Sequence, residues 1–256
     1  MWDPEVYLRF SAERGRPFHE LVARIGASEP RRVVDLGCGP GNLTESLARR
    51  WPNADIEGID WSREMIAEAR AKTTGVEYEV GDVREYVPGD DVDVIVTNAV
   101  LQWVPDHEYL LERWVRPGRW IAMQVPGNYD EPAHVMLREL CASQRWSYRL
   151  GDLRDSVRQV GTAGDYARLF LAAGCDHVDA WETKYLHLLP VLAGARHPVL
   201  EWLSGTGMRP IRQALDDAEW EEFCDEYEVA LRRGYQGKDV VGFAFRRVFA
   251  VTYRKA

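Results

Sequence analysis

VVDLGCGPGNLT, residues 33–44, is the stretch of sequence that decides the fold. A short apolar run is followed by glycines at every second position, Gly37, Gly39 and Gly41. Glycine at the end of a strand permits backbone conformations that other residues rarely adopt, and it lets the chain approach a ligand closely. In an open α/β sheet, ligands bind beyond the carboxyl ends of the strands. The stretch therefore predicts a strand, a ligand-binding turn and a following helix.

Two classes of ligand suit a glycine-rich turn of this kind. A nicotinamide dinucleotide favours the spacing G-x-G-x-x-G, whose third glycine would fall at position 42, where the sequence has Asn42. Asp35 lies just ahead of the turn, and a carboxylate there is an unfavourable neighbour for a pyrophosphate. The same carboxylate is a good neighbour for an ammonium group. The pattern therefore argues against a dinucleotide.

The first half of the chain alternates between strand and helix patterns. Strands are predicted at 32–37, 55–60, 76–82, 92–98 and 119–125, with helices at 42–51, 63–72 and 107–115. Ser62 is expected to cap the second of these helices. Alternation with such short connections predicts an α/β fold, a mostly parallel Rossmann-like sheet covered by helices on both faces.

The second half has a different pattern. Two strand-like segments, 177–188 and 242–254, are separated by about fifty residues of helical character that include an acidic run at 216–233. We expect the late strands to join the far edge of the sheet, one of them antiparallel, and the acidic run to be a solvated helix face. The predicted organisation is an N-terminal helical segment, 1–30, that covers the site, a core of 31–189 and 240–256, and a helical cap, 190–239.

Composition restricts the partners and the compartment. Hydrophobic residues make up 46% and charged residues 29% of the chain, as in soluble globular proteins. The net charge of −9 weighs against nucleic acid as a partner. Residues 1–10 lack the pattern of a signal peptide, and no apolar window approaches the length of a membrane span. Four scattered cysteines without a C-x-x-C pair predict neither a metal site nor a disulfide framework, so a cytoplasmic location is expected.

Residues 33–41 resemble the first motif of class I S-adenosylmethionine-dependent methyltransferases. The resemblance implies that Asp60 accepts hydrogen bonds from the two ribose hydroxyls, because a carboxylate offers two acceptor oxygens to two adjacent donors. It also implies that Asp82 and Val83 contact the adenine. The full cofactor set that the resemblance implies is Asp35, Gly37, Gly39, Gly41, Asn42, Asp60, Trp61, Met65, Asp82, Val83, Asn98, Ala99 and Leu101.

Nearly end to end, the chain is similar to the trans-aconitate 2-methyltransferase family. The most specific matches are NAVLQWVPDH at 98–107 and EPAHVMLRE at 131–139, with TGMRP at 206–210 and FRRVFAV at 245–251. The resemblance implies methyl transfer from S-adenosyl-L-methionine to a carboxylate of trans-aconitate, which yields a monomethyl ester and S-adenosyl-L-homocysteine. A carboxylate with a pKa of about 4 is ionised at neutral pH. No general base is therefore expected, and no catalytic residue is predicted beyond positioning and desolvation.

A polycarboxylate substrate needs cations for the carboxylates that do not react. The planar fork of arginine matches a carboxylate best. Histidine and tyrosine are weaker candidates as donors, and tryptophan as a pocket wall. The predicted substrate-binding residues are Arg14, Arg16, Trp103, His134, Tyr185, His187, Arg209 and Arg247. No metal ligand is predicted.

Three alternatives remain open. The methyl acceptor could be another small carboxylic acid, or an acid attached to an acyl carrier, although the acidic run argues against a basic docking face for a carrier. Alternatively, the protein could belong to a different functional class and be a regulatory module that binds S-adenosylmethionine without turning it over. Release of S-adenosylhomocysteine with a panel of acids separates these alternatives.

Overall fold

The computed structural model describes residues 11–72, 75–153, 160–205 and 207–256. The chain divides into two compact units. The core unit comprises Gly15–Pro126, Gly161–Thr183 and Arg247–Ala256. The helical unit comprises Gly127–Val160 and Lys184–Arg246, with residues 11–14 among the described N-terminal residues.

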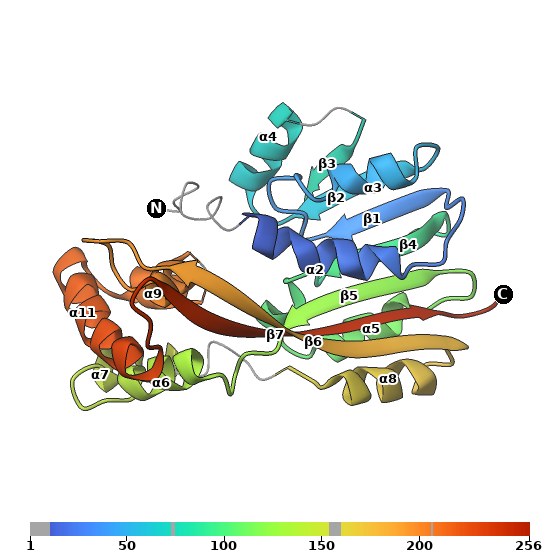
Figure 1. Cartoon of the computed structure of the whole chain (residues 1–256). Helices are drawn as coiled ribbons and strands as arrows, with labels where there is room; N and C mark the ends of the chain where they lie inside the picture. The colour runs from blue at the N-terminus through green and yellow to red at the C-terminus, as the bar shows by residue number, and fades with distance from the viewer. Residues whose placement is uncertain (1–10, 73–74, 154–159, 206) are drawn as a thin grey trace. The chain divides into compact units, whose positions relative to one another are not determined.

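The described residues form a seven-stranded sheet in the order β3-β2-β1-β4-β5-β7-β6 (Figure 1). The strands are β1(Arg32–Leu36), β2(Asp55–Asp60), β3(Glu77–Val80), β4(Val92–Asn98), β5(Trp120–Pro126), β6(His177–Pro190) and β7(Val240–Tyr253). The first five pair in parallel, whereas β5 and β7 pair antiparallel. The strand order reverses between β1 and β4, which is where open α/β sheets bind ligands. The structure confirms the predicted fold class.

Helices flank the sheet in the core unit. They are α2(Ser11–Ala23), which belongs to this unit from Gly15 onward, and α3(Glu45–Arg50), α4(Arg63–Lys72), α5(His107–Trp114) and α8(Ala163–Ala172). Both faces of β1 and β4 are covered, since buried residues follow one another along these strands rather than alternating with exposed ones. The predicted cap of α4 is confirmed, because the Ser62 hydroxyl accepts a hydrogen bond from the Met65 N–H at 3.2 Å.

The helical unit is built on its own apolar core. It contains α6(Pro132–Cys141), α7(Ser147–Leu150), α9(Pro198–Ser204), α10(Arg209–Ala214) and α11(Asp217–Gly234), with residues 184–190 of β6 and 240–246 of β7. Trp202, Phe223, Tyr227 and Phe243 are fully buried in this core. The acidic run of α11 was expected to be a solvated helix face, and Asp216, Asp217, Glu221, Glu222 and Asp225 are indeed exposed. Several of the acidic side chains of α11 are also paired with arginine: Arg196, for example, is bonded to three of these carboxylates.

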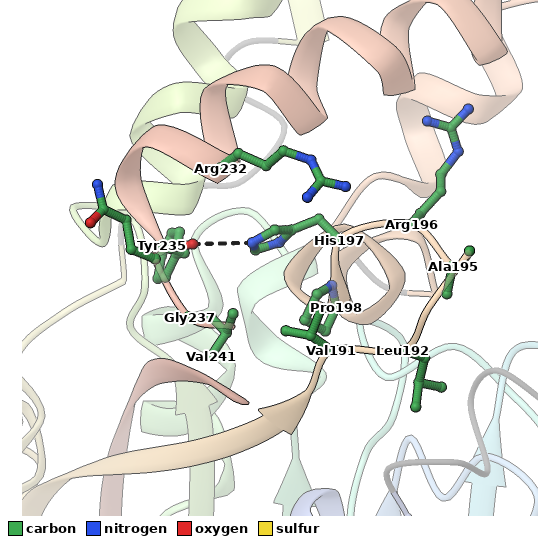
Figure 2. A pocket seen from close by; sticks show the side chains of 12 residues that line it. Val191, Leu192, Ala195, Arg196, His197, Pro198, Arg232, Tyr235, Gly237 and Val241 are labelled. Atoms are coloured by element: carbon green, nitrogen blue, oxygen red, sulfur yellow. Dashed lines mark hydrogen bonds between the residues drawn. The ribbon is translucent and has the colours of Figure 1, made fainter. Parts of the chain in front are cut away.

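A pocket of about 410 Å³ lies in the helical unit and is drawn in Figure 2. Arg196, His197, Arg232 and Tyr235 are among its lining residues. His197 is already bonded on both sides, since Nδ1 accepts from the Val199 N–H and Nε2 lies 3.3 Å from the Tyr235 carbonyl oxygen. None of the residues predicted from the sequence to bind cofactor or substrate lines this pocket.

The helical unit is larger than the cap predicted at 190–239. It also takes in α6 and α7, because α6 packs against α11. The Tyr227 hydroxyl donates a hydrogen bond of 2.8 Å to the Ala133 carbonyl oxygen, and the Tyr235 hydroxyl accepts one from the Ala133 N–H. Among the described helices, none is long and apolar enough to cross a membrane.

Candidate cofactor and acceptor site

The three glycines of the turn after β1 all adopt positive φ angles, which favour glycine. A Cβ atom added at Gly37 would lie 2.0 Å from Val100 Cγ2, and one at Gly41 would lie 2.5 Å from the hydroxyl of Tyr78. A Cβ at Gly39 would meet no atom within 4 Å. Gly37 and Gly41 are therefore required by protein packing. Gly39, by contrast, borders open space that a ligand can fill.

The carboxylate of Asp60, at the end of β2, holds this turn in place. Its Oδ2 accepts a hydrogen bond from the Gly39 N–H and its Oδ1 accepts one from the Ser62 N–H, both at 2.9 Å. Each oxygen keeps a second lone pair, so two further donors can still bind. The geometry is compatible with the ribose role implied by the resemblance, and that role stays a prediction.

Asp35 is an acid in an apolar place. Its side chain is 3% exposed, and Oδ2 accepts a hydrogen bond of 2.6 Å from the Thr44 hydroxyl. Burial raises the pKa of Asp35 to about 7, and the nearby Asp60 charge adds to this rise, whereas the Thr44 hydrogen bond opposes it. A cation beside Asp35 would favour its ionised form.

Asp82 has a partner that the sequence analysis missed. The Nε and backbone N–H of Arg84 each donate to the Asp82 carboxylate at 2.9 Å. This hydrogen bonding lowers the pKa of Asp82. Asp82 and Val83 are half-buried. An adenine contact at Asp82 would therefore share the carboxylate with Arg84.

The segment after β4 is shaped by a strained residue. Ala99 has φ +58°, a value that residues other than glycine rarely adopt and that is concentrated at functional sites. Its N–H donates to the Gln124 carbonyl oxygen at 2.9 Å, and its own carbonyl accepts from Gln102 Nε2 at 2.7 Å. Asn98 Oδ1 is buried and has no hydrogen-bond partner among the described residues. Leu101 is fully buried.

The remaining cofactor candidates lie at the surface or partly buried. Trp61 is 79% exposed and Asn42 is exposed, whereas Met65 is half-buried. No contact in the described structure ties any of them to a cofactor role. Their assignment rests on the resemblance alone.

The predicted substrate residues are distributed over the two units. Arg16, Trp103 and Arg247 belong to the core unit, and His134, Tyr185, His187 and Arg209 to the helical unit. The side chain of Arg14 lies outside the described part of the chain. Arg16 is exposed and forms an ion pair of 2.7 Å with Glu20 on α2, while Trp103 is 47% exposed.

The helical-unit candidates differ in burial. His134 is buried against Phe245, and burial, with the charge of Arg138, lowers the pKa of His134 to about 4. His187 is buried and stacks on Trp202 with ring centroids 4.6 Å apart. Tyr185 is also buried, whereas Arg209 is exposed at the start of α10. His134 is therefore neutral at physiological pH and offers a carboxylate a hydrogen bond without a charge.

Arg247 is a buried cation on the core portion of β7. It is 6% exposed, and its Nη1 donates to Gln124 Oε1 at 3.3 Å. Gln124, on β5, was not among the residues predicted from the sequence. The sequence could have indicated it, because Gln124 is the polar residue in an otherwise apolar strand, WIAMQVP.

The strand register places five polar side chains on one face of the core sheet. Alternate residues of a strand point to the same side, and paired residues on neighbouring strands share a face. On this basis the shared face carries Asp35, Asp60, Asn98, Gln124 and Arg247. Asp60, Asn98 and Gln124 stand at or near the carboxyl ends of their parallel strands. This edge is the ligand-binding edge of such sheets.

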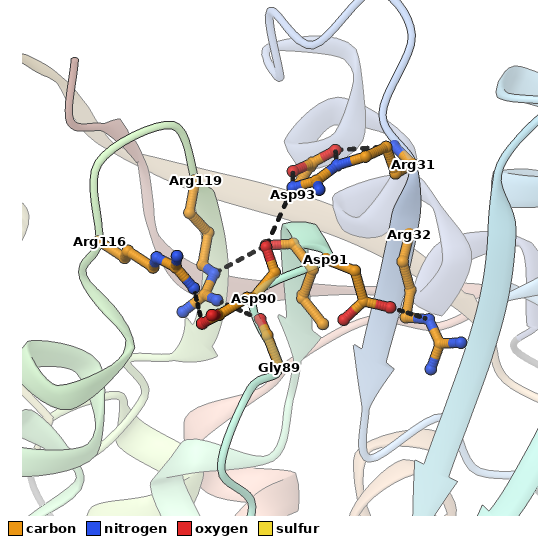
Figure 3. Close-up of polar contacts among 9 residues, drawn as sticks. Arg31, Arg32, Gly89, Asp90, Asp91, Asp93, Arg116 and Arg119 are labelled. Atoms are coloured by element: carbon orange, nitrogen blue, oxygen red, sulfur yellow. Dashed lines mark hydrogen bonds and ion pairs between the residues drawn. The ribbon is translucent and has the colours of Figure 1, made fainter. Parts of the chain in front are cut away.

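The amino ends of the core strands are closed by internal polar contacts instead (Figure 3). Arg31, just before β1, pairs with Asp93 of β4 at 2.7 Å. The buried guanidinium of Arg119 donates to the carbonyl oxygens of Gly89 and Val92. These groups bond one another and hold the loops at this end of the sheet. Within the described ranges, no group of three or more His, Cys, Asp or Glu side chains could hold a metal ion.

Comparison with known proteins agrees with this geometry. A family model described as "Methyltransferase domain" matches residues 33–118, the segment that carries the glycine turn and the first four strand ends. A putative methyltransferase from Bacillus halodurans, solved by crystallography, aligns with a TM-score of 0.59 at 11% identity, over 94% of this chain and all of that one. The protein is thus a Rossmann-like class I methyltransferase.

The sequence relatives define the family more narrowly. The chain is 49% identical to the trans-aconitate 2-methyltransferase of Mycolicibacterium gilvum, over 98% of both chains. It is 46% identical to the protein of that name from Mycobacterium tuberculosis, over 98% of this chain and 96% of the relative. The chain belongs to the trans-aconitate 2-methyltransferase family.

Proposed function

We propose that the protein transfers the methyl group of S-adenosyl-L-methionine to a carboxylate of trans-aconitate and releases the monomethyl ester and S-adenosyl-L-homocysteine. The observation that carries the proposal is the polar face of the core sheet, where Gly39 borders open space beside Asp60 and Arg247 is buried on the same face of the sheet. The names of the relatives, which align along almost the whole chain, supply the substrate.

The residues present fit the cofactor. The space at Gly39 accepts a ligand close to the backbone, Asp60 has free lone pairs for the ribose hydroxyls, and buried Asp35 suits the ammonium group. Asn98 Oδ1 is an acceptor that lacks a protein partner among the described residues. The bound cofactor supplies a methyl group on a positively charged sulfur. The other residues proposed to line this site are Gly37, Gly41, Asn42, Trp61, Met65, Asp82, Val83, Ala99 and Leu101.

The acceptor needs orientation rather than activation. Its carboxylates are ionised at neutral pH, so the protein does not have to remove a proton before the transfer. The chain must hold one carboxylate in line with the methyl group and exclude water. Arg247 is the cation best suited to this, because a buried guanidinium attracts a carboxylate more strongly than an exposed one. We retain Arg14, Arg16, Trp103, His134, Tyr185, His187 and Arg209 as proposed contributors.

The test is turnover with a panel of acids. Purified protein is incubated with S-adenosylmethionine and trans-aconitate, cis-aconitate, citrate, isocitrate or a simple monocarboxylate, and S-adenosylhomocysteine and the ester are measured by mass spectrometry. The proposal expects the highest kcat/KM with trans-aconitate. A higher value with another acid would move the substrate assignment to that acid. Cofactor binding without release of S-adenosylhomocysteine for any acid would identify a regulatory module instead.

We further propose that the protein acts in the cytoplasm on a small polycarboxylate, with neither nucleic acid nor membrane as a partner. All four cysteines are free and buried, which suits a reducing compartment. The net charge of −9 disfavours nucleic acid. Separation of cell lysate into soluble and membrane fractions, with detection of the protein in each, tests the location.

A further inference from the structure

Gln124 is a buried amide whose hydrogen-bonding capacity is only partly used. Its side chain is 0% exposed, on a strand whose other central residues, Ile121 to Val125, are apolar and buried. Its Oε1 accepts a hydrogen bond from Arg247 Nη1 at 3.3 Å. Its Nε2 has no hydrogen-bond partner among the described residues. A buried donor without a partner destabilises a fold by roughly 1–3 kcal/mol.

The orientation of this amide follows from its neighbour. If the amide were turned around, its NH₂ group would face the guanidinium of Arg247, and two donors would oppose each other. With Oε1 toward Arg247, the NH₂ group of Gln124 is directed elsewhere. A leucine or methionine at this position would fill the strand without an unsatisfied donor. The amide therefore has a use that packing does not explain.

The position of Gln124 indicates what that use is. Gln124 lies in register with Asn98 on β4, at the carboxyl end of the parallel strands. It shares a face of the sheet with Arg247 on β7. An N–H donor and a guanidinium on one face at this edge form a receptor for an anion with two or more acceptor oxygens. Carboxylate is the anion that the proposed reaction brings to this edge.

We propose that Gln124 positions the substrate: Nε2 donates a hydrogen bond to the carboxylate that Arg247 binds, while Oε1 holds the guanidinium of Arg247 in place. This inference rests on the proposed function, methyl transfer to a polycarboxylate. One carboxylate is then held by two residues from neighbouring strands. A rigid clamp of this kind fixes the acid relative to the methyl donor and selects for acids that carry the clamped carboxylate.

Two substitutions at position 124 separate this role from a structural one. Gln124→Glu keeps an acceptor for Arg247 but removes the donor and adds a negative charge next to the substrate. Gln124→Met keeps the size of the side chain and removes both polar groups. Thr97→Val is the matched control, because Thr97 on β4 is fully buried, its Oγ1 also lacks a partner among the described residues, and it points to the opposite face of the sheet.

Calorimetry measures two dissociation constants: that of trans-aconitate in the presence of S-adenosylhomocysteine, and that of S-adenosylmethionine in the absence of the acid. Steady-state kinetics then give kcat and KM. Loss of a hydrogen bond to a charged group predicts trans-aconitate binding weaker by roughly 10- to 150-fold in both Gln124 variants. Cofactor affinity should change less than about threefold by the same reasoning, since the cofactor is not the partner of Gln124. Thr97→Val should leave both constants unchanged.

Each outcome decides between the two proposals. A wild-type protein that neither binds nor methylates trans-aconitate overturns the proposed function, whatever the variants do. A wild-type protein that does both, with Gln124→Glu and Gln124→Met binding the acid equally well, overturns the inference and leaves the function standing. An equal loss in Thr97→Val also overturns it, because the effect would then be general to the core. If Gln124→Glu does not fold, as a thermal melt would show, Gln124→Met decides alone.

Discussion

Acidification should weaken cofactor binding through Asp35. Burial raises the pKa of this carboxyl to about 7, so that in the ligand-free protein it is half protonated near neutral pH. In the proposed site the ammonium group of S-adenosylmethionine lies beside this carboxylate and favours its ionised form, so protonation should compete with binding. The ionised fraction falls from about one half at pH 7 to about one hundredth at pH 5. The affinity should accordingly fall by about 50-fold, or about 2.3 kcal/mol.

Calorimetric titration of the cofactor from about pH 5 to about pH 7 measures this effect directly. Proton release on binding, obtained from buffers of different ionisation enthalpy, should be greatest at the acid end of this range. Asp35→Asn should bind more weakly at neutral pH and lose most of the pH dependence. Thr44→Val removes a hydrogen bond that lowers the pKa of Asp35, so its loss of affinity should begin at higher pH. An identical pH dependence in wild type and Asp35→Asn would refute the reasoning.

The pH dependence of the stability of the ligand-free protein tests independently whether the pKa of Asp35 is raised on folding. The pKa of Asp35 is higher in the folded protein, about 7, than its ordinary value of 3.8. The folded state therefore binds more protons than the unfolded state between these two values. The contribution of Asp35 to the free energy of unfolding should fall as the pH rises through this window. Thermal melts of Asp35→Asn should lack that component.

Three further outcomes are expected. Asp60→Ala should weaken S-adenosylmethionine binding by about 2–3 kcal/mol, measured by calorimetry, because the turn loses its Gly39 bond as well as the proposed ribose acceptor. Gly37→Ala should unfold at a lower temperature, because the added Cβ would collide with Val100. Gly39→Ala should lose cofactor affinity more than stability, because its Cβ would enter the open space of the proposed site and only the strain of the positive φ would lower stability. With saturating substrates, kcat should be flat from about pH 6 upward, since no protein base must lose a proton first; a limb near neutral pH that a histidine substitution removes would contradict this.

The sequence predicted the strands and helices of the core unit better than the side-chain contacts between them. The bounds of β2, α4 and β4 agree with those expected, because apolar runs with polar ends and a serine cap mark them locally. The pairing of Arg84 with Asp82 and that of Gln124 with Arg247 were not predicted. Both pairs depend on which rotamer meets which neighbour in the folded chain, and the spacing of residue types does not contain this.

The extent of the helical unit could not be predicted for a similar reason. Its first helices, α6 and α7, follow β5 directly in sequence, so a reading of strand and helix patterns assigns them to the core. α6 packs instead on α11, nearly a hundred residues further along the chain, and α7 packs on α10. The decisive contacts, such as that of Tyr227 with the Ala133 carbonyl oxygen, join segments whose patterns are each typical of any amphipathic helix.

Burial ranks the predicted substrate residues more sharply than residue type does. His134 has its pKa lowered to about 4, so it is neutral and cannot balance the charge of a carboxylate. Arg16 is exposed and paired with Glu20, and an exposed pair contributes little to binding because water screens it. Arg247 alone among the described arginine candidates is buried, and there its attraction for an anion is weakly screened.

Arg247→Lys keeps the charge but loses the planar fork, and it should reduce kcat/KM for trans-aconitate by roughly 10- to 150-fold with little effect on cofactor affinity. Arg209→Lys, at an exposed position, tests the ranking in the same assay: an equal or greater loss there would show that burial is the wrong criterion.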